Sequence, residues 1–224
     1  MRARFPGDTL DRGAGMKDWL DRIFGGPATS DAHRLVELDE FCGPDATTLE
    51  RLAEVFENAA TLLKPYADGS VSQAFWDLNS NVFFALSDES IEWVIRLRVI
   101  QSFEPLFRGL FAVRCQSTLG HLDKEGDSPL NTACYMWFDM GCWYSSPVPL
   151  ARNRLDFAFL DSMRSILAID HDACRESALH GLGHWHQDHA ESVENIIDEF
   201  LRREPHLQNE LREYAQSARI GYVL

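Results

Sequence analysis

Histidine is concentrated in one short segment of this 224-residue chain. Four of its eight histidines fall within RESALHGLGHWHQDH, residues 175–189. If this segment is a helix, Glu176, His180 and His184 recur every four residues and form one stripe. Two histidines at that spacing can bind one metal ion, and two imidazoles with a carboxylate suit iron or another divalent metal. Histidine also titrates near neutral pH, so the stripe predicts a candidate site for metal binding or acid–base catalysis.

The geometry of a straight helix limits what this stripe can do on its own. Glu176 and His184 would lie about 12 Å apart along the axis, so one ion cannot easily contact both. The segment between the histidines reads HGLGH and lacks the catalytic glutamate of an HExxH metalloprotease helix. A metal site would therefore need His180, His184 and a ligand from another helix. We favour the simpler interpretation that both histidines hydrogen-bond to neighbouring helices or line an exposed groove.

The other faces of the same helix indicate close packing. Apolar residues between Cys174 and Trp185 form a stripe that would face the core, with the histidine stripe turned away from it. Gly181 and Gly183 fall on the flanks between these two faces. Each glycine costs about 1 kcal/mol relative to alanine in a helix interior. Their presence therefore predicts that neighbouring helices approach this helix closely.

A second candidate residue, Asp139, lies in the apolar segment YMWFDMGCW. A charged carboxylate in such surroundings is costly unless it is paired. One interpretation is a buried tie between Asp139 and an arginine, and the other is a pairing with a histidine near position 180. The candidate arginines are Arg96, Arg98, Arg108 and Arg114.

The second interpretation of Asp139 describes a pocket. In it, Asp139 would face His180 and His184 inside walls formed by nearby aromatic side chains, which suits a small-molecule site. The same aromatic residues are typical of an ordinary core, and this is the interpretation that we favour for them. They are Tyr135, Trp137 and Trp143.

The elements that must position these residues are all predicted to be helices. A short amphipathic helix begins at Met16, where translation could equally start, and helical periodicity then dominates from about residue 45. No stretch shows the alternation of a strand. Pro105 predicts a break near Ser102. Further helices are expected to end at Gly120 and to cover 129–146, and the last four to start near 155, 172, 190 and 205.

These last four helices predict how the chain is organised. A helix pair about every 35 residues indicates stacked antiparallel pairs, that is, an all-α, HEAT-like α-solenoid, with an irregular helical bundle as the alternative. We expect an N-terminal tail with a short helix over residues 1–30, and a single all-helical domain over 31–224.

The segment ACRESALHGLGHWHQDH, followed by two amphipathic helices, supports the same fold. Together with CYMWFDM it resembles the closing repeats of HEAT-like helical-repeat proteins, of the kind found in uncharacterised bacterial families. The resemblance covers roughly residues 130–222. It implies a helical-repeat fold and no particular activity, because a fold does not define a function.

Composition narrows the choice of partner and compartment. A net charge of −14 disfavours nucleic acid as a partner and suits a basic protein partner, or only keeps the chain soluble. Five cysteines without a C-x-x-C pair are expected to be small core residues of a reduced, cytoplasmic protein. No apolar run approaches the ~20 residues of a membrane span.

The sequence therefore favours a non-catalytic helical-repeat module that binds a protein partner through an acidic and polar concave face, and the negative charge of the chain suits a basic partner. The alternative is a small-ligand or metal-binding enzyme whose site surrounds Asp139, Glu176, His180 and His184. No cofactor is predicted apart from the divalent metal of that alternative.

Overall fold

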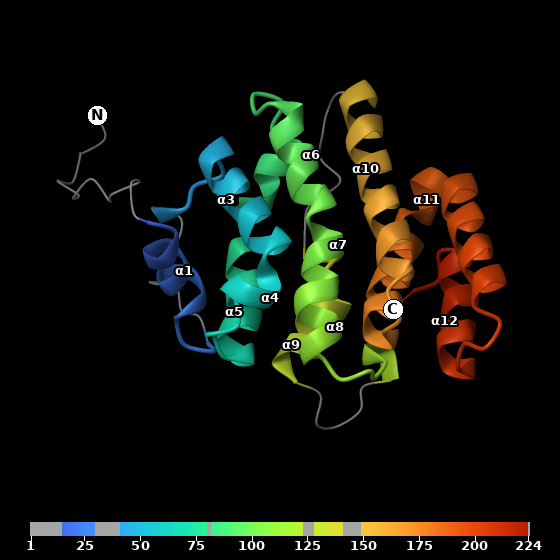
Figure 1. Ribbon diagram of the computed structural model, residues 1–224. Coiled ribbons are helices and arrows are strands. Elements are labelled where there is room, and N and C mark those ends of the chain that lie inside the picture. The colour runs from blue at the N-terminus through green and yellow to red at the C-terminus, as the bar shows by residue number, and fades with distance from the viewer. Residues whose placement is uncertain (1–14, 30–40, 80–81, 123–127, 141–148, 224) are drawn as a thin grey trace.

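The computed structural model describes residues 15–29, 41–79, 82–122, 128–140 and 149–223, and of residues 149–153 the backbone alone. Every regular element within these ranges is helical, and no strand occurs among them. The prediction of an all-α protein is therefore confirmed at the level of fold class. Figure 1 shows the helices standing side by side, with the order from α1 to α12 along the chain largely kept in space.

The N-terminal half is built from short helices, and a capping residue marks the start of one of them. Asp45 caps the second of them, because its carboxylate accepts a hydrogen bond from the Thr48 backbone N–H at 2.9 Å. The first helix packs Trp19 and Phe24 into the core against α5. The elements are α1 (Met16–Phe24), α3 (Ala46–Glu57), α4 (Ala59–Leu62), α5 (Asp68–Asn79), the 3₁₀ helix η1 (Val82–Ser87) and α6 (Trp93–Gln101).

The predicted break before Pro105 is confirmed, but the helix after it is shorter than expected. Ser102 ends α6, and α7 (Phe103–Leu106) continues through a π-helical turn, η2 (Phe107–Phe111), into α8 (Ala112–Arg114). The helix ends there because Cys115 is extended, with φ −79° and ψ 151°. The expected end at Gly120 was therefore wrong, and Gly120 instead opens a short 3₁₀ turn, η3 (Gly120–Leu122).

The C-terminal half corrects two further boundaries. The helix expected over 129–146 is regular only as α9 (Pro129–Tyr135), and residues 141–148 lie outside the described residues. The helices expected from about 172 and 190 are one helix, α11 (Asp172–Arg203). It follows α10 (Pro149–Leu167) and precedes α12 (Asn209–Arg219).

A kink at His189 replaces the predicted break in α11. His189 has non-helical angles, φ −137° and ψ 39°. Its ring is held by Asp156 of α10, with 2.8 Å between Nε2 and Oδ2, and it stacks on Trp185. The helix continues beyond the kink because neither proline nor glycine interrupts the chain there.

The core centres on Trp137, whose indole is 1% exposed. Phenylalanine rings from α3, α5, η1, α7 and η2 surround it at centroid distances of 5.2–6.0 Å. This packing assigns Trp137 to the core rather than to a pocket wall. The surrounding rings are Phe56, Phe75, Phe83, Phe103, Phe107 and Phe111.

Four of the five cysteines lie in the described part of the chain, and these four are buried, as predicted: Cys42, Cys115, Cys134 and Cys174. Of these, Cys115, Cys134 and Cys174 are free thiols. None of the described helices combines the length and the apolar character that crossing a membrane requires.

Candidate functional site

The site begins at the turn that follows α9. Trp137 and Phe138 are both 1% exposed and anchor this turn in the core. The backbone N–H groups of Asp139 and Met140 each donate to the carbonyl of Met136 at 2.9 Å, which closes the turn. Asp139 is thereby held at the protein surface, with its carboxylate directed at α11.

Gly181 allows this turn to lie against α11. A Cβ atom at position 181 would be 2.7 Å from the side chains of Phe138 and Met163, closer than atoms can pack. The close approach predicted from the two glycines is therefore confirmed at Gly181. At Gly183 the neighbour is Val223 of the C-terminal segment, where an added Cβ would meet Val223 Cγ1.

Asp139, His180 and His184 converge on one point. Asp139 Oδ2 lies 2.9 Å from His180 Nε2, and Asp139 Oδ1 lies 2.8 Å from His184 Nε2. The two Nε2 atoms are 3.2 Å apart. Within the described residues, this is the one group of three or more histidine, cysteine or acidic side chains whose ligand atoms all lie within 4.8 Å of one another.

The site is open on one side. The His180 side chain is 1% exposed, whereas those of Asp139 and His184 are 26% and 35% exposed. Burial opposes ionisation of Asp139, but the hydrogen bonds from both imidazoles outweigh it and hold the pKa of Asp139 well below its usual range. The same contact with Asp139 raises the pKa of His184 above its usual value of 6.5. The carboxylate is therefore ionised at neutral pH and available as a ligand.

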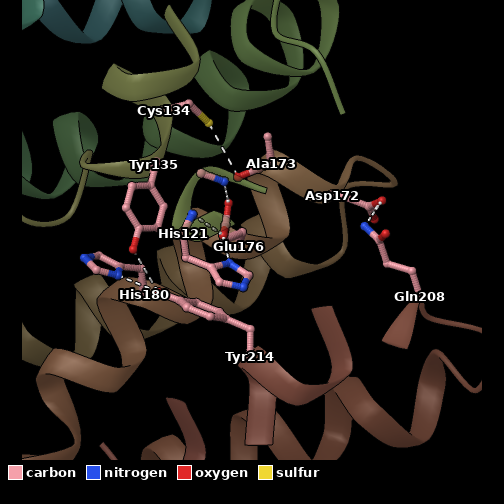
Figure 2. Close-up of polar contacts among 10 residues, drawn as sticks. His121, Cys134, Tyr135, Asp172, Ala173, Glu176, His180, Gln208 and Tyr214 are labelled. Atoms are coloured by element: carbon pink, nitrogen blue, oxygen red, sulfur yellow. Dashed lines mark hydrogen bonds and ion pairs between the residues drawn. The ribbon is translucent and has the colours of Figure 1, made fainter. Parts of the chain in front are cut away.

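Two tyrosines complete the surroundings of His180 (Figure 2). Tyr214 Oη lies 2.6 Å from His180 Nδ1, on the side of the ring away from Asp139. The Tyr135 ring packs against the His180 ring with the centroids 4.5 Å apart and the planes tilted by 47°, and its hydroxyl lies 3.3 Å from that of Tyr214. Burial raises the pKa of Tyr214, and the hydrogen bond with Tyr135 raises it further. The Tyr214 hydroxyl is therefore neutral and can both donate and accept a hydrogen bond.

Glu176 does not belong to the Asp139–His180–His184 cluster, although it lies on the same stripe of α11. It is fully buried, and its carboxylate accepts hydrogen bonds from the backbone N–H groups of Gly120 and His121, at 2.6 and 3.1 Å. It also pairs with His121 Nδ1. The stripe is covered along part of its length: η3, α9 and α12 pack over Glu176 and His180, which are buried, whereas His184 is partly exposed.

The remaining candidates are placed as follows. Asp139 pairs with histidines rather than with an arginine, and Tyr135 lies at the site. Trp143 lies outside the described residues. The arginines proposed as partners have other contacts: Arg96 donates to the carbonyls of Ile91 and Leu86, Arg98 pairs with Glu57, Arg108 with Glu104, and Arg114 with Asp68.

Sequence reasoning missed Tyr214 and His121. Tyr214 lies in the apolar stripe of α12 with Leu211, Ala215 and Ala218, so its spacing indicates only a core residue. His121 begins the acidic segment HLDKEGDSP, whose composition is typical of an exposed loop. The one signal that could have found Tyr214 is its hydroxyl, because a buried tyrosine needs a hydrogen-bonding partner.

Comparison with known proteins adds no relative. No protein family, no curated protein and no solved structure matches this chain. In its described part the chain is an all-helical protein, and its candidate site is a partly exposed cluster of two histidines and one aspartate.

Proposed function

We propose that this protein binds a divalent transition metal ion through Asp139, His180 and His184 and presents it to a small ligand. The observation that carries the proposal is the spacing of the three ligand groups, 2.8–3.2 Å from one another. Donor atoms about 2.0–2.1 Å from a zinc-sized ion lie roughly 3 Å apart, so an ion fits with little movement of the side chains.

The chemistry of the donors supports the choice of ion. Two neutral imidazoles and one carboxylate suit iron, zinc and the neighbouring divalent metals, and three protein ligands leave coordination positions free. The free positions would face outward, because Asp139 and His184 are the exposed members of the set. An ion in such a site acts as a Lewis acid toward an oxygen-bearing ligand.

Metal content tests this proposal directly. Purified protein is stripped with a chelator, titrated with Co²⁺, Zn²⁺, Fe²⁺ or Mn²⁺ by calorimetry, and assayed by elemental mass spectrometry. We expect one ion per chain, and a loss of about a hundredfold in affinity for His184→Asn. His186→Asn is the matched control, because His186 lies on the same helix and contacts Glu194 instead. Equal binding by both variants, or no binding by the parent chain, would refute the proposal.

A second candidate function is the binding of a protein partner by HEAT-like stacked helix pairs with an acidic, polar concave face. It is supported by the order of the helices in Figure 1 and by the net charge of −14, which favours a basic partner. The buried free cysteines support a reducing compartment, as expected for a cytoplasmic protein. Reversing two exposed charges, Glu210→Lys and Glu213→Lys, is expected to abolish such binding and leave metal binding intact.

A further inference from the structure

The contact of His180 Nδ1 leads to an inference that rests on the proposed metal function. The His180 ring is 1% exposed, so both of its nitrogens need partners within the protein. Nε2 faces Asp139 and His184, and Nδ1 faces the hydroxyl of Tyr214. The state of Tyr214 is therefore coupled to the state of the ligand nitrogen.

Binding an ion fixes the direction of this hydrogen bond. An ion on Nε2 requires the lone pair of that nitrogen, so the proton of a neutral ring must be on Nδ1 and must be donated to Tyr214 Oη. Without an ion, Nε2 can carry the proton and donate it to Asp139, and the Tyr214 hydroxyl then donates to Nδ1. A hydroxyl serves both states because it donates and accepts, whereas a carboxylate in its place would only accept.

His121 and Glu176 support the Tyr214 ring, and of the two only Glu176 is buried. The His121 ring stacks on the Tyr214 ring at 4.5 Å with an angle of 23° between the planes. Glu176, which is fully buried, holds His121 by its ring nitrogen and its backbone N–H. Figure 2 shows His121 between Glu176 and Tyr214. The position of the hydroxyl thus depends on two residues that do not touch the ion site.

We propose that Tyr214 is a positioning residue for the metal site: its hydroxyl orients His180 and accepts the Nδ1 proton in the ring tautomer that binds the ion, and the Glu176–His121 pair fixes the Tyr214 ring. Glu176 is then part of the site as a support and not as a ligand. The phenol ring also forms one wall of a cavity of about 320 Å³, which Tyr222 lines as well. This cavity supplies both a matched control residue and a route for chemical rescue.

The first test compares Tyr214→Phe with Tyr222→Phe. Tyr222 lines the same cavity and is 66% exposed, so its variant controls for the loss of a hydroxyl. We expect Co²⁺ affinity to fall about 10- to 100-fold in Tyr214→Phe and to stay unchanged in Tyr222→Phe. The visible spectrum of bound Co²⁺ should change as well, because the orientation of one ligand ring is no longer fixed; a purely structural role for Tyr214 would leave that spectrum as it is in the parent chain.

The second test restores the hydroxyl without the side chain. In Tyr214→Ala, phenol should occupy the enlarged cavity and recover Co²⁺ affinity, whereas toluene, which has nearly the same shape but no hydroxyl, should not. Equal effects of phenol and toluene, or Tyr214→Phe with unchanged affinity and spectrum, would overturn the positioning role alone. Absence of Co²⁺ binding by the parent chain would instead refute the metal function on which it rests.

Discussion

His180 and His184 place their Nε2 atoms 3.2 Å apart from positions one turn apart on α11, and Asp139 meets both from a different element. The histidine spacing alone brings the two rings to one face of the helix. The Asp139 carboxylate lies close to both rings because the turn after α9 packs against Gly181. The candidate site is thus shared between two segments that are about forty residues apart in the chain.

Metal binding should stabilise the folded chain by mass action. At a free Co²⁺ concentration one hundred times the dissociation constant, the free energy of unfolding should rise by about 2.7 kcal/mol. Urea denaturation followed by far-UV circular dichroism, with and without Co²⁺, measures this gain. At the same Co²⁺ concentration the gain should fall to about 0.4 kcal/mol in His184→Asn and persist in His186→Asn; an equal gain in both would point to binding elsewhere.

The metal-free protein should lose stability as the pH rises above neutral. The pKa of His184 is raised from 6.5 by Asp139, so its contribution is complete below pH 6.5 and is lost as pH rises through the raised value. The pKa of Asp139 is lowered from 3.8, so its contribution is present above pH 3.8 and is lost in more acidic solution. The effect should be about 1 kcal/mol or less, because both side chains are partly exposed.

Chelator-treated protein, unfolded with urea at a series of pH values, provides the measurement for this prediction. His184→Asn should make the decline above pH 6.5 shallower, because asparagine does not titrate; the hydrogen bond with Cys174 also raises the pKa of His171, so part of the decline remains. If the variant declines as steeply as the parent chain, the Asp139–His184 pair is not its source.

Gly181→Ala should destabilise the protein and weaken the site. Its Cβ would meet Phe138 and Met163 at 2.7 Å, and such overpacking costs about 1–3 kcal/mol, against a gain of about 1 kcal/mol in helix propensity. Pushing Phe138 away also moves Asp139, so Co²⁺ affinity should fall. Urea denaturation and calorimetry measure the two effects.

Gly183→Ala is the natural comparison for that variant. Its Cβ would meet the side chain of Val223, which lies outside any helix, is partly exposed and can shift at little cost. The loss of stability should therefore be smaller than for Gly181→Ala, and Co²⁺ affinity should stay close to that of the parent chain. A larger loss at Gly183 would contradict this account of the two glycines.

Asp45→Ala should cost about 1 kcal/mol of stability, because it removes the side-chain acceptor of the Thr48 N–H at the start of α3. Thr47→Ala, an exposed change in the same helical turn, is the control and should have a much smaller effect. Thermal or urea unfolding of the two variants distinguishes them, and equal stability of both would contradict a capping role for Asp45.

The sequence by itself determined the helical class and the break at Ser102, because each depends on residues near in the chain, and its glycine at position 181 indicated a close approach of other segments. It also brought His180 and His184 to one face. Which end of the stripe takes part in the site was decided by tertiary structure. Periodicity defines faces of a helix, but not what covers them.

The packing of η3, α9 and α12 around α11 determines which residues of the stripe lie at the site. It directs Glu176 to His121, brings Asp139 to the two histidines, and places Tyr214 behind His180. None of these pairs is close in the sequence, so no local pattern encodes them. They form because burying the apolar faces of these helices brings the polar groups together, and buried polar groups must then find partners.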